Sequence, residues 1–296
     1  MTTRDQWIQG ARPRTLPAAV APVLVGSAIA YFEQGFRFGI ALLALVVALS
    51  FQVGVNYSND YSDGIRGTDD VRIGPIRLVG QGLANPKAVR QAALMSYAVG
   101  AVAGLLMVAL SGLWILIPVG LASVAAAWFY TGGSRPYGYL GLGEIFVFVF
   151  FGLVAVVGTS ASQTGQISTL SLLGGVACGA LSCAILVVNN LRDRENDEQV
   201  GKMTLAVRLG DKRTRELYRT LFLIAYTMPV IMTAMTTGPK FAYVVLLTML
   251  SARRPLMAMQ NGATGPELLP ILVDTGKVLL LFALSISVGI SASPTS

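Results

Sequence analysis

Two polar segments, each at the end of a long apolar run, hold the residues best suited to chemistry. Both open on the pattern Asn-x-x-x-Asp and continue with a further aspartate at helical spacing. The first box, residues 56–70, contains Asn56, Asp60 and Asp63, and the second box, residues 189–198, contains Asn189, Asp193 and Asp197. Such spacing projects each set from one face of a helix. Carboxylates inside a membrane cost about 2.5–3.5 kcal/mol each, so these acids are expected to face a polar cavity.

The donor types in the boxes favour a magnesium site. The chain has no histidine and no cysteine near either box, and hard oxygen ligands suit Mg²⁺ rather than zinc. Basic residues follow both boxes and suit phosphate oxygens. They are Arg66, Arg72 and Arg77 after the first box, and Lys202 and Arg208 after the second. Carboxylates, a hard cation and arginines together indicate a diphosphate site. The plainer alternative is two ordinary interfacial loops, which a repeated box disfavours.

Composition places the chain in a membrane. Of its 296 residues 54% are hydrophobic and only 12% charged, far from the usual soluble composition. Nine apolar runs approach the roughly 20 residues that cross a bilayer. They fall at about 16–33, 38–58, 88–110, 112–130, 143–161, 168–190, 216–237, 240–258 and 275–292. No removable signal peptide is expected. Cys178 and Cys183 are expected to be buried thiols.

The basic residues predict the orientation. With a cytoplasmic N-terminus, only Arg37 and Lys240 of the 22 lysines and arginines lie outside. This asymmetry explains the net charge of +7 without nucleic acid as a partner. It also puts both boxes on the cytoplasmic side, where they can meet across one cavity. We expect a single domain over 1–296, with two loosely similar halves at about 1–140 and 141–296.

A third inner loop, residues 130–144, is rich in glycine and tyrosine. Tyr130, Tyr137 and Tyr139 could stack on an aromatic ring, although a tyrosine belt at the membrane interface is an alternative. Glu144 follows at the start of an apolar run. It most simply stabilises the positive end of that helix, and the other possibility is that it faces the cavity.

The motifs resemble those of the UbiA superfamily of intramembrane prenyltransferases, and most closely its 1,4-dihydroxy-2-naphthoate branch in menaquinone synthesis. The likeness covers about residues 7–290. It rests on both boxes with Gly74-Pro75-Ile76-Arg77 and Gly201-Lys202-x-Thr204, on Ala11-Arg12-Pro13-Arg14-Thr15, and on Tyr130-Thr131-Gly132-Gly133. The superfamily often has a further aspartate where Gly67 stands, which leaves open a role for Asp69 or Asp70.

The resemblance implies an all-α bundle of about nine transmembrane helices around a central cavity, with a cytoplasmic polar cap in the cell (plasma) membrane. It implies transfer of a polyprenyl group from a prenyl diphosphate to 1,4-dihydroxy-2-naphthoate, with loss of diphosphate and CO2, and no obligate protein partner. Asp60, Asp63, Asp193 and Asp197 would hold Mg²⁺, assisted by Asn56 and Asn189. Lys202 and Arg77, with Arg66, Arg135 and Arg192, would bind diphosphate. Arg14, Asn59, Tyr130, Tyr137 and Tyr139 would lie near the acceptor.

Three other functions stay open. A CDP-alcohol phosphotransferase motif begins at Asp60-Tyr61-Ser62-Asp63-Gly64 but fails at Gly67-Thr68. An ion-coupled transporter could use intramembrane acids, but it needs no bases after each box. Within the superfamily the acceptor could instead be 4-hydroxybenzoate, homogentisate or a haem precursor. Prenyl chain length is also undetermined.

Overall fold

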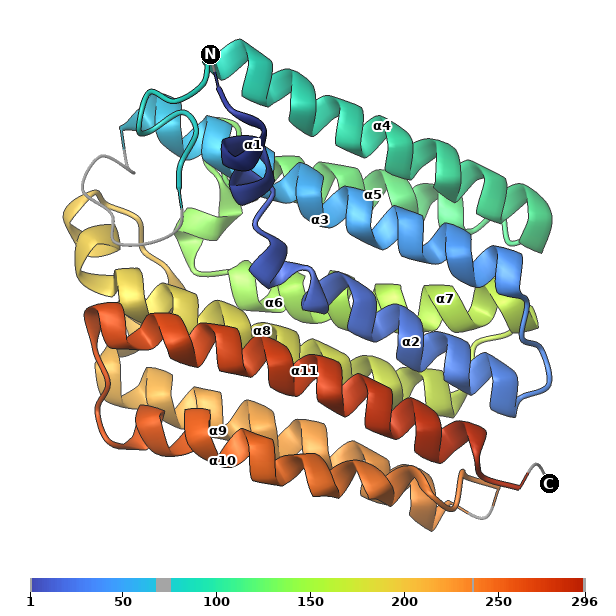
Figure 1. Cartoon of the computed structure of the whole chain (residues 1–296). Coiled ribbons are helices and arrows are strands. Elements are labelled where there is room, and N and C mark those ends of the chain that lie inside the picture. Colours follow the sequence, from blue (N-terminus) through green and yellow to red (C-terminus); the bar gives the residue numbers. More distant parts are fainter. Residues whose placement is uncertain (1, 68–75, 236, 295–296) are drawn as a thin grey trace.

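The computed structural model describes residues 2–67, 76–235 and 237–294, and in these ranges every regular element is a helix. The helices run nearly side by side (Figure 1). They are α1 (Arg4–Gly10), η1 (Pro13–Thr15), α2 (Pro17–Phe32), α3 (Phe38–Arg66), α4 (Pro86–Ser111), α5 (Leu116–Phe129), η2 (Tyr137–Leu140), α6 (Gly143–Val147), η3 (Phe148–Val154), α7 (Ala155–Thr164), α8 (Thr169–Gln199), α9 (Leu205–Ala234), η4 (Ala242–Thr248), α10 (Met249–Gln260), η5 (Gly265–Glu267) and α11 (Leu268–Ser291). The all-α prediction is confirmed.

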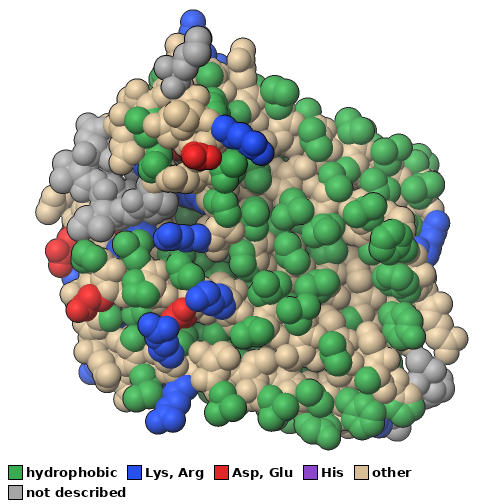
Figure 2. All heavy atoms as spheres, viewed as in Figure 1, with side chains coloured by type: hydrophobic (Ala, Val, Ile, Leu, Met, Phe, Trp, Pro, Cys, Tyr) green, Lys and Arg blue, Asp and Glu red, His purple; other side chains and the backbone are tan. Residues whose placement is uncertain are grey.

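Both boxes lie at the same end of the bundle, which we call the polar end. α3 and α8 end there with the first and second box respectively. Most charged side chains on the face shown in Figure 2 gather at this end, whereas hydrophobic side chains cover most of the rest. On α4 the exposed apolar side chains include Met95, Val99, Val102, Leu106 and Leu110. Such a surface is stable against lipid rather than water, so the chain is an integral membrane protein.

Six helices are long and apolar enough to cross a membrane, or seven if the bent pair before Phe32 is one span, counting only residues that the structure describes. The predicted number of nine is therefore not confirmed. The predicted run 112–130 forms only the 14-residue α5, because Gly112 ends α4 in a left-handed conformation and Ile115 precedes α5. The run 240–258 is divided between the 3₁₀ segment η4 and α10.

α8 is the central helix, because most of its apolar segment is buried. A close crossing holds it against η3, a π-helical turn between α6 and α7. A Cβ added to Gly152 of η3 would lie 2.5 Å from Gly175 O and 2.5 Å from the Cα of Gly179 on α8. Small residues of this kind allow helix backbones to approach closely in membranes. The crossing fixes the second box relative to the helices of the central cavity.

The N-terminal segment bends by 50° where it enters α2. Arg12 adopts a left-handed conformation at the bend (φ 54°), and Pro13 and Pro17 start the two helical pieces that follow. A left-handed arginine is uncommon, since its Cβ crowds the backbone. The bend lays residues 11–15 across α3, next to the first box.

Candidate functional site

Asp60 fixes the segment after the first box. It is fully buried and accepts hydrogen bonds from the backbone N–H groups of Leu78 (2.8 Å) and Val79 (2.9 Å). The backbone packs tightly there, because a Cβ on Gly64 would lie 2.5 Å from the Cβ of Val79. Arg77, which precedes these residues, is buried as well. Asp60 thereby positions the segment that carries a predicted diphosphate ligand.

Asn56 faces the N-terminal segment. Its Nδ2 donates to the backbone oxygen of Ala11 (2.8 Å) and to the Oγ1 of Thr15 (3.1 Å), while Gln52 donates to its Oδ1 (3.4 Å). Asn56 and Asp63 are seven residues apart, or about 10 Å along a helix axis. The amide therefore holds the bend at Arg12, and its auxiliary role toward a metal stays a prediction.

The two boxes meet through Tyr139 and Lys202. The hydroxyl of Tyr139 donates to Oδ1 of Asp63 at 2.9 Å. Lys202 Nζ lies 5.3 Å from the centroid of the Tyr139 ring and 3.6 Å from Oδ1 of Asp197. The guanidinium of Arg66 also lies over this ring, at 5.5 Å. The site is thus a chain of contacts from an acid of the first box to an acid of the second, with two cations stacked on one aromatic ring.

Within the second box, Arg192 is paired with Asp193. Two guanidinium nitrogens donate to the two carboxylate oxygens at 2.7 Å each, and one also donates to Oδ1 of Asn189 at 2.9 Å. Both charged side chains are almost fully buried, with 3% and 4% exposed. The pairing compensates a carboxylate that would otherwise be costly to bury. Arg192, Asp193 and Asn189 are therefore brought together as one group.

The third loop is bound to the first box. Arg66 donates to the backbone oxygens of Thr131 and Gly133, and the Thr131 hydroxyl donates to Oδ1 of Asn59 at 2.9 Å. Asn59 is thus held at the loop, and its place near the acceptor stays a prediction. Arg135 and Arg14 are both exposed, and the structure does not place them in this contact network.

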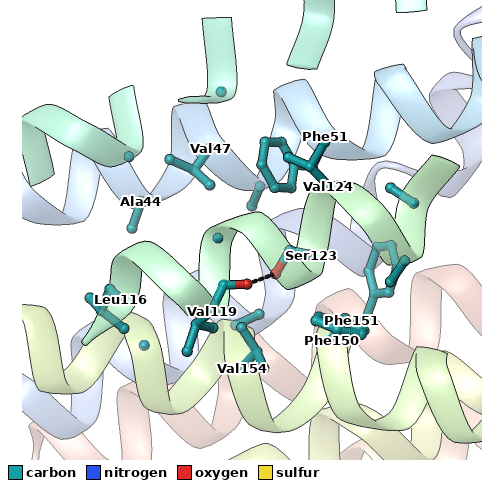
Figure 3. Close-up of a pocket in the computed structure, with 18 of the residues that line it drawn as sticks. Ala44, Val47, Phe51, Leu116, Val119, Ser123, Val124, Phe150, Phe151 and Val154 are labelled. Atoms are coloured by element: carbon teal, nitrogen blue, oxygen red, sulfur yellow. Dashed lines mark hydrogen bonds between the residues drawn. The ribbon is translucent and has the colours of Figure 1, made fainter. Parts of the chain in front are cut away.

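An apolar cavity of about 340 Å³ begins next to this network. Side chains from α3, α5 and η3 converge on it, among them Val47, Phe51, Val119 and Phe150 (Figure 3). Tyr130 and Tyr137 line its polar end, whereas Leu116, at the opposite end of α5, lines the other. An aromatic stack follows the wall, with the ring centroids of Tyr137 and Phe146 3.8 Å apart. The Tyr137 hydroxyl donates to Ala126 O at 2.8 Å, and burial raises the pKa of Tyr137.

Tyr130 stands between the cavity and the acids. Burial raises the pKa of Tyr130, and the nearby charges of Glu144 and, more weakly, of Asp63 in the first box and Asp197 in the second raise this pKa further. Glu144 is buried, with 8% exposed, and its Oε1 accepts from Nδ2 of Asn190 at 2.9 Å. Sequence reasoning named neither Glu144 nor Asn190 as a site residue. The available signals were an acid at the start of an apolar run and the doubled asparagine of the second box.

Arg12 is a third residue that sequence reasoning did not place in the site. Its Nε and Nη2 are buried and have no hydrogen-bond partner among the residues described. Buried guanidinium donors normally have acceptors, so an anion from outside the chain would complete this group. Its left-handed backbone is a second sign, because strained residues concentrate at functional sites.

The donor chemistry of the acids fits magnesium. Within residues 2–67, 76–235 and 237–294, no three His, Cys, Asp or Glu side chains form a ready metal cluster. Asp63 and Asp197 are the acids that the Tyr139–Lys202 contacts bring toward each other. Asp60 already accepts two amide bonds, but a carboxylate has about four acceptor positions. Asp69, Asp70 and Arg72, considered from the sequence, lie outside the described residues.

Comparison with known proteins identifies close relatives. Residues 19–263 match the UbiA prenyltransferase family. The chain is 50% identical to 1,4-dihydroxy-2-naphthoate octaprenyltransferase of Mycobacterium tuberculosis (strain ATCC 25618 / H37Rv), over 97% of each protein. It is 35% identical to the enzyme of the same name in Haemophilus influenzae, over 96% of this chain and 95% of the relative. A UbiA homolog from Archaeoglobus fulgidus, solved with GPP and Mg²⁺, superposes with a TM-score of 0.70 at 15% identity, covering 97% of this chain and all of the other. That likeness shows the fold alone.

Proposed function

The chain belongs to the UbiA prenyltransferase family, and on that basis we propose that it transfers a polyprenyl group from a prenyl diphosphate to 1,4-dihydroxy-2-naphthoate. Diphosphate and CO2 leave, and the product is a demethylmenaquinone. The identity of 50% over 97% of a relative with this activity in its name supports the acceptor. The observation that carries the chemistry is the meeting of the two acidic boxes beside an apolar cavity.

The prenyl chain occupies the cavity. The wall between Tyr130 and Leu116 follows the 14 residues of α5, which at 1.5 Å per residue extend about 20 Å. An apolar wall of this length binds hydrocarbon through the hydrophobic effect and excludes water from a reactive allylic cation. The reacting end of the chain then lies at Tyr130, next to the acids.

The diphosphate binds at the polar end. Lys202, Arg77 and Arg66 supply positive charge there, and Arg192, Arg135 and Arg12 are further candidates. Donors and cations aimed at a leaving group stabilise the charge that develops on it. Asp63 and Asp197 would hold magnesium, with Asp60 and Asp193 one turn earlier on the same helices, assisted by Asn56 and Asn189. The ion would supply a Lewis acid for the leaving diphosphate.

The acceptor ring approaches the prenyl carbon from the side of the third loop. Tyr130, Tyr137 and Tyr139 supply aromatic surface there, with Asn59 beside them, and Arg14 is a candidate for binding the carboxylate of the acceptor. A ring carbon forms the new bond to the prenyl group as the carbon–oxygen bond to diphosphate breaks.

We further propose that the protein lies in the plasma membrane with its N-terminus and polar end in the cytoplasm, as one domain over 1–296 with related halves at about 1–140 and 141–296. The distribution of lysine and arginine supports this orientation. Its partners are the two substrates and the lipid bilayer, without nucleic acid or an obligate protein partner.

Purified protein in detergent tests the proposal. It is given a prenyl diphosphate, Mg²⁺ and 1,4-dihydroxy-2-naphthoate, and prenylated, decarboxylated product is measured with and without chelator. We expect product and diphosphate in equal amounts, lost with chelator and restored by Mg²⁺. Product only with 4-hydroxybenzoate or another aromatic acceptor would overturn the assigned acceptor. Folded protein that releases no diphosphate with any acceptor would favour a transporter.

A further inference from the structure

Glu144 is a buried acid whose second oxygen has no assigned use. The side chain lies in the first turn of α6 with 8% of its surface exposed. Its Oε2 is buried and accepts no hydrogen bond from any residue in the described part of the chain. No lysine or arginine in those ranges forms a salt bridge with it. Burying a carboxylate oxygen without a hydrogen-bond donor is costly. A buried oxygen of this kind is expected where a bound ligand supplies the donor.

The other oxygen is held firmly. Nδ2 of Asn190 donates to Oε1 at 2.9 Å, and the Cys183 thiol donates to the backbone oxygen of Glu144 at 3.0 Å. Both partners belong to α8, the helix that ends in the second acidic box. Oε2 is therefore presented in one direction by a rigid pair of helices, as positioned catalytic groups require.

Glu144 lies where the apolar cavity meets the polar end of the bundle. A Cβ added to the preceding residue, Gly143, would lie 3.4 Å from the hydroxyl oxygen of Tyr130. Tyr130 lines the cavity, and its pKa is raised by burial and, in second place, by the nearby charge of Glu144. Val147, one helical turn after Glu144, also lines the cavity. The carboxylate is thus next to the place where the acceptor ring must meet the prenyl carbon.

The negative charge of Glu144 limits which groups of the two substrates this side chain can bind. A carboxylate repels the diphosphate and the carboxylate of the acceptor. It accepts hydrogen bonds, and the only strong donors on the two substrates are the ring hydroxyls of the acceptor. The free oxygen of Glu144 therefore matches a phenolic O–H group.

We propose that Glu144 is the catalytic base of the transfer, binding one ring hydroxyl of the acceptor through Oε2 while Asn190 positions it; this rests on the function proposed above. As the ring carbon bonds to the prenyl carbon and the bond to diphosphate breaks, the hydroxyl proton moves to Oε2. The O–H electron pair stays on the ring oxygen, which takes carbonyl character. When CO2 leaves, its bonding pair returns to the ring, and the proton returns from Glu144 to that oxygen.

Glu144→Gln tests this, because the amide oxygen can still accept from Asn190 while the base is lost. The variant is assayed with 1,4-dihydroxy-2-naphthoate and with the two monohydroxy analogues, 1-hydroxy-2-naphthoate and 4-hydroxy-2-naphthoate. Analogues that turn over too slowly are measured as competitive inhibitors. We expect a loss of about 30-fold or more for compounds that keep the contacted hydroxyl, and of less than about threefold for the analogue without it. Affinity for an unreactive prenyl thiodiphosphate should be unchanged.

Glu33→Gln is the matched control. Glu33 ends α2 at the opposite end of the bundle, and its Oε2 is also buried without a hydrogen-bond partner in the described residues. The Glu33→Gln variant should leave the turnover of all three compounds unchanged. A Glu144→Gln variant with near-normal turnover, or one that weakens all three compounds equally, would overturn the proposal. Wild-type protein that makes no product with the dihydroxy compound would instead refute the proposed function.

Discussion

The hydroxyl of Tyr139 donates a 2.9 Å hydrogen bond to Asp63, so a residue of the third loop holds an acid of the first box. The same ring lies beneath Lys202, which is 3.6 Å from Asp197 of the second box. One side chain therefore contacts both halves of the site, through its hydroxyl on one side and its ring face on the other.

Tyr139→Phe separates these two contacts. It removes the hydrogen bond to Asp63 and keeps the ring beneath Lys202, so kcat/KM should fall about tenfold, the usual worth of one hydrogen bond. Tyr139→Leu should cost more, because both contacts are lost. Tyr243→Phe is the control, since Tyr243 is an exposed residue of η4. Steady-state rates in detergent measure the effect, and equal losses in the Phe and Leu variants would contradict it.

Asp60→Asn and Asp63→Asn should differ in stability. An asparagine at position 60 turns its amide NH2 group toward one of the two backbone N–H donors, those of Leu78 and Val79. This donor is then left without an acceptor, which lowers the free energy of unfolding by about 1–3 kcal/mol. Both activity and Tm should therefore fall. Asn at position 63 can still accept from Tyr139, so Tm should change little while turnover falls about 100-fold or more. Thermal unfolding and turnover are measured on the same samples. Equal Tm values would show that Asp60 does not hold the 77–80 segment.

Gly120→Leu should shorten the usable cavity. Gly120 lines the cavity, and an added Cβ there would meet no atom within 4 Å, so a larger side chain fits. We expect kcat/KM to fall about tenfold or more for long prenyl diphosphates and to stay within about threefold for geranyl diphosphate, because small steric changes in a pocket give such ratios. Gly39→Leu on α3 is the control, with equal free space outside the cavity wall. A uniform loss across chain lengths would refute this placement.

Arg12 and Arg14 should differ in their effect on substrate binding. The guanidinium of Arg12 has buried nitrogens without partners among the residues described, whereas Arg14 is exposed. Arg12→Met should therefore raise the KM of one anionic substrate by about tenfold or more, the usual effect of losing a charge-assisted bond. Arg14→Met should have a smaller effect. Separate titration of the prenyl diphosphate and the naphthoate identifies the anion, and a larger loss with Arg14→Met would reverse the assignment.

Helical spacing correctly predicted that the acids of each box share a helix, and hydropathy correctly predicted an all-α membrane protein. Spacing could not predict which neighbour each acid meets. Asn56 and Asp63 share a face but lie about 10 Å apart along the axis. One therefore meets the N-terminal bend and the other meets Tyr139. Such partners come from segments far away in the sequence.

The predicted number of nine spans stays unconfirmed for a local reason. Hydropathy counts apolar residues and does not register where a helix breaks, as it does around Gly112 and in η4. Glu144 was missed as a site residue because an acid in the first turn of a helix has an adequate local explanation. Its burial and its bond to Asn190 become visible only when α6 packs on α8.

Glycine and alanine residues on several helices contribute to the cavity wall, whereas the charged groups of the site lie at the polar end. The small wall residues include Ala18, Ala44, Gly104, Gly120, Ala155 and Gly158. One nucleotide change in any of these codons can enlarge a side chain and thereby change the length of prenyl chain that the cavity holds. The polar end is left untouched by such a change. Lineages could therefore alter the tail of their quinone while inheriting the same reaction intact.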